Sequence, residues 1–581
     1  MRKAVLVFLL ALVCLSSLFA NNGQKTYLMS DDVWKMVDKI CRMNGVLGPT
    51  PISPSTEAEM LTALSRLDYN KLNSESKELY DRIVAKLDST KGWAYKDEKL
   101  TLDPSISINP QIYLFNNTKN TYGEEFFMQY KDRDQLLSID LEASIYDNIY
   151  LDFHYSYMDT PTTFGLDSNG KQVTGDYFHN FSNFATFFNI AMNNDFTGVF
   201  TGNNGNKGTI IFSYQPTKVG GSFGNEFFNL FIGRTRQAFG NGVTGNLIIG
   251  DNFTYQEVAK LSVFTNVFSY HLSLTHYDNA EKYESFRFDT KHQSRTIQRL
   301  DFNINNKLRF AINIGAHIYS NSMFDWRMIM PMMLVHNWNN NSEETGLTPG
   351  DEINNILGLE AEWVINRKFM LTTQIAIDQF RLPIEKSSKV PSAFGVLVNA
   401  KYITPVNSGI FDSWLEIVYT NPYLYLNHKT DSEGANANYC LDHIAGYYWS
   451  DQAEKGELNY LGHSFGPDTI AISIGTEFIS NSNYDISASL LYKIHGEKGI
   501  EYGYWPKQNQ SNAVEVGNEV STPSGVAEHT VECTISGSYK LNNNLSFNGS
   551  VLNRMQWNYH NIKGETKYSI QTSFGLRWII L

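Results

Sequence analysis

The chain has 581 residues, more than one ordinary globular core accommodates, although a closed β-barrel of this size forms a single unit. Its mean hydropathy of -0.31, together with the lack of a long apolar run after the N-terminus, argues against a helical membrane protein. The formal net charge of -13 is unfavourable for binding nucleic acid, so we expect no such partner.

Residues 1–20 have the pattern of a secretory signal peptide. Arg2 and Lys3 form a charged start, an apolar stretch follows, and Ala20 offers a cleavage site. The alternatives are an uncleaved anchor and a lipoprotein attached at Cys14, but the apolar stretch is short and Cys14 lies within it. We therefore expect an exported protein whose signal peptide is removed.

Residues 21–100 predict a periplasmic module of about three helices. Thr56 and Glu59 form a capping box ahead of the second helix. The apolar faces of these helices either pack only on one another or also dock under the barrel that follows. We expect residues 101–122 to be a linker. The apolar stripes at helical spacing are Val33, Met36, Val37, Ile40 and Cys41; Met60, Leu61, Leu64 and Leu67; and Leu79, Ile83, Val84 and Leu87.

Residues 123–581 predict a transmembrane β-barrel, because the apolar period changes there from 3.6 to 2. Polar residues must face the interior, since a charge that faces lipid at mid-membrane costs about 2–4 kcal/mol. The last strand shows the pattern most clearly. Its apolar face carries Ile570, Thr572, Phe574, Leu576, Trp578 and Ile580, and its other face carries Gln571, Ser573, Gly575, Arg577 and Ile579.

The connections between the expected strands alternate between tight and long, as in bacterial barrels with short periplasmic turns and long external loops. This alternation gives about 18 antiparallel strands. Because the number is even, the first strand begins and the last strand ends on the periplasmic side. The tight connections are 305–307, 366–368, 480–483 and 540–544, and the long ones are 421–468 and 494–530.

Residues 320–355 do not alternate, and Pro331 would interrupt a strand ladder. We expect this segment to be a long external excursion that folds into the barrel mouth. The alternative is an ordinary strand, which would require another strand elsewhere to keep the number even.

The run Gly240-Asn-Gly242-Val-Thr-Gly245 matches a dinucleotide-binding pattern, but no amphipathic helix follows it. Residues 246–252 are expected to run into a further strand, and the glycines to let an irregular loop turn and pack closely. An exported protein also meets no cytosolic dinucleotide pool.

No other motif predicts catalysis. No Gly-x-Ser-x-Gly and no His-Glu-x-x-His occurs, and three widely spaced cysteines remain after signal cleavage: Cys41, Cys440 and Cys533. We therefore expect no metal, no cofactor and no disulfide framework. Inward carboxylates could serve a glycosidase, but ion pairs with inward basic residues are the favoured interpretation. The carboxylates are Asp140, Glu142, Glu360 and Asp378, and the basic residues are Arg309, Lys401, Lys493 and Arg577.

Aromatic residues and amides are frequent in the expected external loops, as in Trp326 and Trp338. Flat aromatic faces and amide partners suit sugar rings, although such residues also form girdles at the lipid interface.

Several stretches, in the right order, resemble the Wzi-type capsule-assembly proteins of the outer membrane. Phe239 stands where that family leads us to expect Trp. The stretches are Ile232–Asn252, Asn354–Glu360, Gln374–Phe380 and Tyr460–Asp468.

The resemblance covers the chain from about residue 25 to its end. It implies a lectin-like outer-membrane barrel that binds or organises surface polysaccharide and is not an enzyme. We expect surface polysaccharide and outer-membrane lipid as partners, and a monomer. The alternative function is a porin or substrate-specific channel. The residues that we expect to contact glycan are Arg234, Arg236, Asn241, Asp251, Trp326, Arg327 and Trp338. For Arg234 and Arg236, pairing with carboxylates is the structural alternative.

Overall fold

The structure, a computed structural model, describes most of the chain after the expected signal peptide. Residues 1–20 and Trp338 lie outside the described part. The described residues are 23–87, 94–97, 99–116, 132, 136–157, 162–166, 172–176, 185–188, 218–253, 255–277, 292–320, 322–330, 352–379, 391–430, 436–441, 443–450, 455–499, 513–515 and 520–580.

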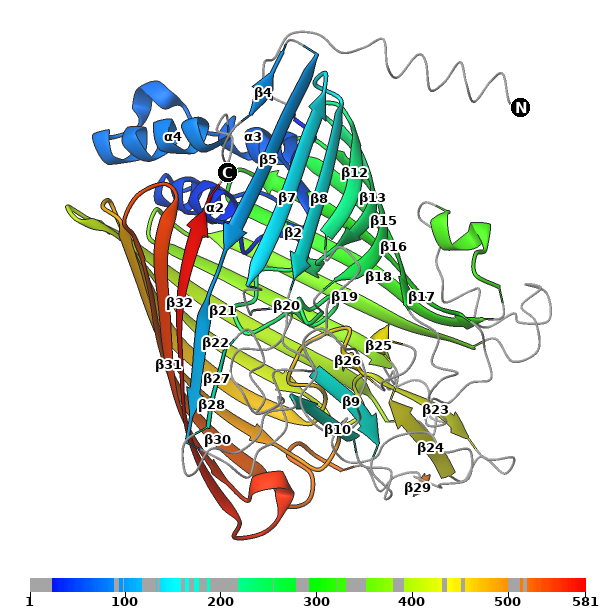
Figure 1. Cartoon of the computed structure of the whole chain (residues 1–581). Coiled ribbons are helices and arrows are strands. Elements are labelled where there is room, and N and C mark those ends of the chain that lie inside the picture. Colours follow the sequence, from blue (N-terminus) through cyan, green and yellow to red (C-terminus); the bar gives the residue numbers. More distant parts are fainter. Residues whose placement is uncertain are drawn as a thin grey trace.

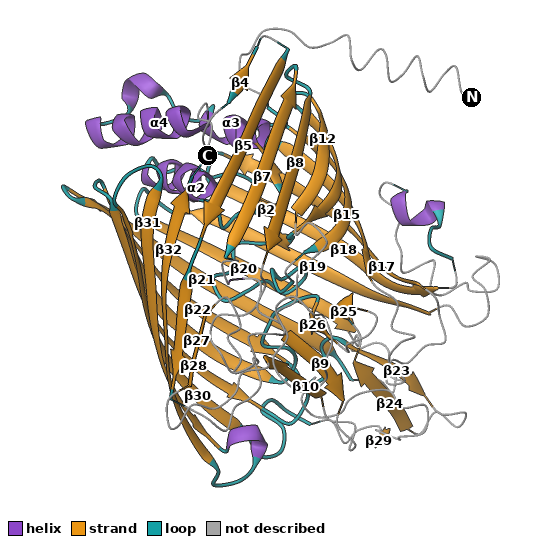
Figure 2. Cartoon of the chain, viewed as in Figure 1, coloured by secondary structure: helices purple, strands orange, loops and turns teal. Residues whose placement is uncertain are grey.

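Eighteen antiparallel strands close into a barrel, as the sequence predicts (Figures 1 and 2). The first of them is interrupted, so that β6 continues β5. The ring closes where β32 pairs with both, through Gln571 opposite Phe115 and Trp578 opposite Ile108. The strands are β5 (Leu100–Ile108) with β6 (Gln111–Phe115), β7 (Leu137–Ile145), β8 (Ile149–Tyr157), β12 (Lys218–Gly224), β13 (Phe228–Thr235), β15 (Gln256–Phe264), β16 (Phe268–Tyr277), β17 (His292–Asn305), β18 (Leu308–Ser320), β19 (Glu352–Val364), β20 (Phe369–Gln379), β21 (Ala393–Val406), β22 (Gly409–Thr420), β27 (Thr469–Ser480), β28 (Tyr484–His495), β30 (Glu528–Lys540), β31 (Leu545–Trp557) and β32 (Thr566–Ile579).

The barrel begins earlier than predicted. β5 starts at Leu100, so the linker expected at residues 101–122 and the barrel start at 123 are wrong. This stretch contains Pro104 and Pro110, and proline cannot donate to a ladder. One edge of β5 pairs with β7 over the whole strand, but the other edge pairs only near its ends, with β4 and with β32. Pro104 is tolerated because that second edge has no partner at its position.

The strand faces follow the predicted alternation, which β17 illustrates. Arg299 and Asp301 point into the barrel and are almost completely buried. Phe302 and Ile304 point outward and are exposed, as expected for a wall that faces lipid. The polar interior that the sequence pattern indicates is therefore present.

The tight and long connections also lie where the sequence places them. Only two residues separate β17 from β18, whereas 421–468 separate β22 from β27. The tight turns gather at one end, which is the periplasmic end by the rule for bacterial barrels. Figure 1 shows the helices at this end and the small strands β9, β10 and β23 to β26 toward the other.

The N-terminal module consists of α2 (Asp32–Met43), α3 (Glu57–Leu64) and α4 (Ser74–Leu87), with a 3-10 turn, η1 (Tyr69–Lys71), between the last two. The predicted capping box is confirmed, because the Thr56 and Glu59 side chains each bind the other residue's backbone N–H. In the described part of the chain, no helix is long and apolar enough to cross a membrane.

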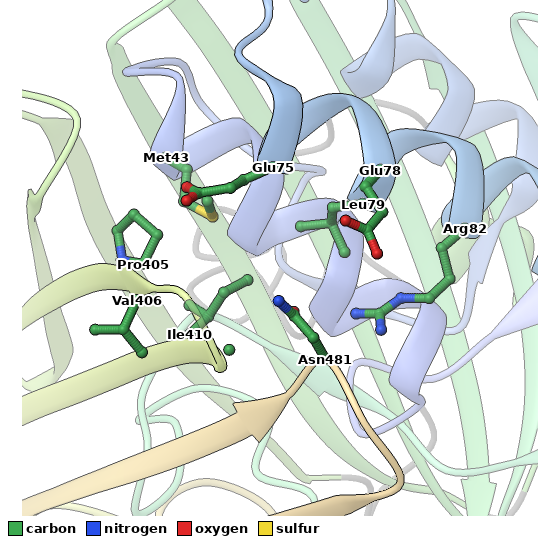
Figure 3. A pocket seen from close by; sticks show the side chains of 10 residues that line it. Met43, Glu75, Glu78, Leu79, Arg82, Pro405, Val406, Ile410 and Asn481 are labelled. Atoms are coloured by element: carbon green, nitrogen blue, oxygen red, sulfur yellow. The ribbon is translucent and has the colours of Figure 1, made fainter.

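The module packs on itself and also docks on the periplasmic rim. Arg42 donates to Asp38 at 2.8 Å on its own helix and to Asp412 of β22 at 2.9 Å. Lys39 pairs with Glu477 of β27 at 2.6 Å. Figure 3 shows a shallow pocket between α4 and the turn from β21 to β22.

The remaining elements are short. They are β1 (Thr26–Tyr27), β2 (Ile52–Ser53), β3 (Ser55–Thr56), β4 (Tyr95–Lys96), β9 (Thr162–Leu166), β10 (Gln172–Asp176), β11 (Ala185–Phe188), β14 (Ala238–Phe239), β23 (Leu426–Thr430), β24 (Asn436–Leu441), β25 (Ile444–Ser450), β26 (Lys455–Tyr460), β29 (Ala513–Glu515), η6 (Trp326–Ile329) and η8 (Tyr559–Asn561).

Candidate functional site

Residues 236–253, which lie between β13 and β15, fold into the lumen, and we call this segment the plug. It crosses the barrel interior, because its backbone is bonded to side chains on strands far around the wall. Ile248 accepts from Arg295 of β17 at 2.6 Å, and Leu247 donates to Gln374 of β20 at 3.0 Å. The plug therefore occupies space that would be water in an open channel.

Glu416 of β22 holds the turn of the plug. Its carboxylate is buried and accepts the backbone N–H groups of Val243 at 2.6 Å and Thr244 at 2.8 Å. The Thr244 hydroxyl donates to the same carboxylate. This one wall carboxylate thus gives two backbone N–H groups of the turn a charged acceptor where no neighbouring strand supplies one.

The glycines of the plug act as the sequence analysis expects. Gly240 has a φ of +119°, in the region that favours glycine, and a Cβ there would collide with the Gln374 side chain. A Cβ at Gly358 of β19 would likewise collide with Ile248 of the plug. Residues 246–252 pack as an irregular segment, and the further strand into which they were expected to run, β15, begins at Gln256.

Apolar residues of the plug form a core with the inner wall. Phe239, Leu247 and Ile249 are almost completely buried and pack in one cluster with Leu397 and Val418. A filled, apolar contact of this kind is characteristic of a protein interior rather than of a water-filled channel.

Loop residues 460–468 cover the plug. The Asn252 side chain donates to the carbonyls of Tyr460 at 2.9 Å and Gly462 at 2.6 Å. His463 Nε2 lies 3.2 Å from the Thr244 hydroxyl. His463 is in a loop rather than in a membrane-spanning strand. Burial, together with the nearby Lys493 ammonium, lowers its pKa to about 3, so the ring is neutral.

The N-terminal module meets the plug from the periplasmic side. β2 pairs with β14, through Ile52 opposite Phe239, and Gly240 N–H donates to the carbonyl of Pro51 at 2.8 Å. Lys260 of β15 donates to the carbonyl of Pro54. The lumen is therefore filled by segments that are far apart in the sequence.

Three of the predicted glycan contacts belong to the plug. Arg236 donates to Asp251 at 2.8 Å, and this partly exposed ion pair joins the two ends of the plug. Asn241 is buried, donates to Glu362 at 2.9 Å and accepts from Lys401. Asn241 therefore fixes the plug to the wall, whereas Arg236 and Asp251 remain near solvent.

Arg234 occupies a different place. It lies near the external end of β13 and shares the outward face of Leu230 and Ile232, which are exposed. Its guanidinium donates to Glu257 of β15 at 2.8 Å and stacks over the ring of Tyr255, with 4.1 Å to the centroid. Arg234 is thus paired with a carboxylate of the outer wall.

The excursion expected at residues 320–355 is external, since β18 ends at Ser320 and β19 begins at Glu352. Its expected fold into the barrel mouth is wrong for residues 322–330. There, η6 lies on the outer face of the wall, where the carbonyl of Met328 accepts from Thr296 of β17 at 2.7 Å. Trp326 is 73% exposed on that face, so the structure does not bring it together with Arg236. Arg327 lies in η6, but its side chain is outside the described part.

The inward carboxylates are engaged in bonds, although not with the partners predicted. Glu360 pairs with Arg299 at 2.8 Å, and Glu142 pairs with Lys25 of the module at 2.7 Å. Asp378 accepts the backbone N–H of Tyr425 at 3.0 Å. Within the described ranges, no group of His, Cys, Asp and Glu residues is arranged to hold a metal ion.

The plug as a unit is not predicted from the sequence. A signal was available, because the stretches that resemble the capsule-assembly family meet here. The plug itself comes from the first, Gln374 from the third, and Gly462 and His463 from the last.

The fold and its filled lumen define the class: a closed, antiparallel β-barrel of the outer-membrane type. Among solved structures, this chain is similar to Wzi of Escherichia coli, described as an outer-membrane protein involved in group 1 capsule assembly and as a carbohydrate-binding β-barrel. The two chains share 13% identity with a TM-score of 0.55, over 95% of this chain and 98% of Wzi. At this identity the likeness shows the fold alone.

Two further solved structures, one of them described as an outer-membrane channel, are more distant. DcaP of Acinetobacter baumannii shares 9% identity over 84% of this chain and 99% of its own, with a TM-score of 0.34. OccK11 of Pseudomonas aeruginosa shares 8% identity over 82% and 95%, with a TM-score of 0.33. No family model and no curated protein matches the sequence.

Proposed function

We propose that this protein is a non-enzymatic outer-membrane barrel of the Wzi type, which binds and organises surface polysaccharide. The observation that carries the proposal is the plug, because a lumen filled by bonded protein does not serve diffusion. The barrel instead presents a closed external surface to the cell exterior. We also propose that the chain reaches the outer membrane after its signal peptide is removed.

The similar structure supports the polysaccharide, since Wzi is described as carbohydrate-binding and matches this chain over nearly its whole length. The chemistry of the two ends of the plug, where Arg236 pairs with Asp251, also supports polysaccharide binding. Arg236 and Asp251 are both partly exposed and together offer charge-assisted donors and acceptors. Such groups bind sugar hydroxyls, and a guanidinium also binds acidic sugars.

The alternative, a channel, requires inward polar side chains that face water. In this barrel Glu416, Gln374 and Arg295 instead bind the plug backbone. Wild-type protein in a planar bilayer is therefore expected to show no conducting steps, whereas steady large conductance would favour the channel.

Binding tests the proposal directly. The full mature chain, refolded in detergent, is titrated with surface polysaccharide extracted from its source bacterium. We expect saturable binding. The affinity should fall about tenfold, or about 1.4 kcal/mol in binding free energy, when Arg236→Gln removes the positive charge at the end of the plug. Glu532→Gln is the matched control, because this carboxylate pairs with Arg554 on the wall of another sector. A folded wild type that binds no polysaccharide would refute the proposal.

A further inference from the structure

The outer wall of the barrel has a polar strip where lipid would be expected. On β17, Arg295 and Arg299 point inward to the plug and to Glu360, so the alternate residues Thr296 and Gln298 point outward. Polar side chains at such positions are unusual on a lipid-facing wall. On the paired strand β18 the outward residues stay apolar, as Ala316 opposite Thr296 shows.

Residues 322–330 cover this strip. The Thr296 hydroxyl donates to the carbonyl of Met328 at 2.7 Å, and the Gln298 amide donates to the carbonyl of Met330 at 3.0 Å. The Met328 side chain is 2% exposed and packs on Ala316 and neighbouring apolar residues of the outer wall. The loop is thus fixed to the outside of the barrel by two hydrogen bonds and one apolar anchor.

The loop runs back along the wall from the external strand ends. β17 and β18 end together at His292 and Ser320. Thr296 and Gln298 lie about 13 Å and about 20 Å along β17 from that end, at roughly 3.3 Å per residue. Figure 1 shows η6 as the green helix outside the wall, beside β17 and β18. The segment therefore turns toward the membrane.

Five of its eight other side chains are apolar, and four of these five are exposed; Ser322, Asp325 and Arg327 are the polar members of the segment. Trp326 is 73% exposed and makes an edge contact with Phe324, with ring centroids 5.3 Å apart. Met323 and Met330 are 61% and 52% exposed. These groups continue the exposed apolar surface of β17 to β19, to which Phe302, Phe310 and Leu359 belong.

We propose that residues 322–330 form a lipid-facing anchor, whose exposed aromatic and methionine side chains insert among the acyl chains of the outer leaflet. Backbone carbonyls at the depth of the membrane need donors, since no water is available there. Thr296 and Gln298 supply two of them, which explains why polar residues occur on the outer wall. The proposal assigns Trp326 to lipid rather than to glycan and does not depend on the proposed function.

Fluorescence quenching tests the anchor. The full mature chain is reconstituted in vesicles of phosphatidylcholine with or without brominated acyl chains. The emission of Trp326 is obtained as the difference between the wild type and Trp326→Phe. We expect brominated lipid to lower this emission at least twofold, and aqueous acrylamide to change it little.

Two matched variants calibrate the measurement. Trp578→Phe reports a wall residue that is exposed on the lipid side, and Trp34→Phe reports a residue buried in the module. The Trp326 signal should behave as that of Trp578 does. Quenching by acrylamide but not by brominated lipid would overturn the proposal. Quenching by neither would overturn it as well and would indicate another chain or segment as the occupant.

A double substitution, Thr296→Val with Gln298→Leu, tests how the loop is held. Without the two donors the loop should leave the wall, so that acrylamide quenches Trp326 at least twofold more strongly than in the wild type. Unchanged quenching by both agents would refute the role of the two donors.

Discussion

Glu416→Ala is expected to release the plug without unfolding the barrel. Glu416 lies on β22, and its backbone pairs with Asn399 of β21 and Ser473 of β27 in any case. The substitution removes only the carboxylate that accepts from Val243 and Thr244. The turn of the plug would then have two backbone N–H groups without their acceptor, that of Val243, which is exposed, and that of Thr244, which is partly buried.

The magnitude follows from those two groups. A hydrogen bond to a charged group contributes about 1.5–3 kcal/mol, and because Val243 is exposed we take about 1.5 kcal/mol for each bond, or about 3 kcal/mol for the two. Since about 1.4 kcal/mol corresponds to a tenfold change in an equilibrium constant, the fraction of molecules with a displaced plug should rise about 10²-fold. The barrel's own strand pairing is unaffected, so its resistance to detergent and heat should remain.

Single-channel recording in a planar bilayer measures the displaced fraction. The wild type should stay closed, and Glu416→Ala should open repeatedly. Glu416→Gln should be intermediate, because one amide oxygen still accepts. Glu532→Gln is again the control, since it changes a lumen carboxylate that is bonded to Arg554. If Glu416→Ala folds and remains as silent as the wild type, the carboxylate does not hold the plug.

Two further predictions concern the periplasmic module. Arg42→Met should remove the hydrogen-bonded guanidinium from Asp412, which keeps only Lys39 at 3.9 Å, at a cost of about 3 kcal/mol, and so make residues 23–87 sensitive to protease. Adding Asp412→Asn should restore part of the resistance. In a Cys440→Ser background, Cys41 should resist maleimide until the protein unfolds, because burial raises the pKa of its thiol to about 12. Cys533, exposed on the wall, should react with a membrane-permeant maleimide, and equal labelling of both thiols would contradict the module's packing.

The sequence predicted the barrel because barrel formation is a local and repeated constraint. Each strand must alternate between lipid and interior, and each pair must be joined by a turn, so β17 and β18 can be identified from their own residues. The capping box at Thr56 and Glu59 is equally local. The alternation was not recognised in β5, and the predicted start of the barrel is therefore wrong.

The plug could not be predicted in this way, because its partners are remote. Val243 and Glu416 are 173 residues apart, and Leu247 and Gln374 are 127 apart. No local pattern links them, because these contacts join segments that are neighbours only in the closed barrel. For the same reason the sequence does not predict the position of residues 322–330. They were expected in the barrel mouth, whereas Met328 packs on the outer wall.

The alternation of strand residues does not distinguish a channel from a closed barrel, since both need a polar interior. The difference lies in which groups form hydrogen bonds with the polar side chains of that interior. Water would satisfy Glu416 and Gln374 in a channel, but here the backbone N–H groups of Val243, Thr244 and Leu247 do so. Opening the lumen would therefore expose donors on the plug and also separate its apolar core from Leu397. Opening therefore costs both the hydrogen bonds of the plug and its apolar contacts with the wall. Substitution of polar wall residues alone should reveal only the cost of the lost hydrogen bonds.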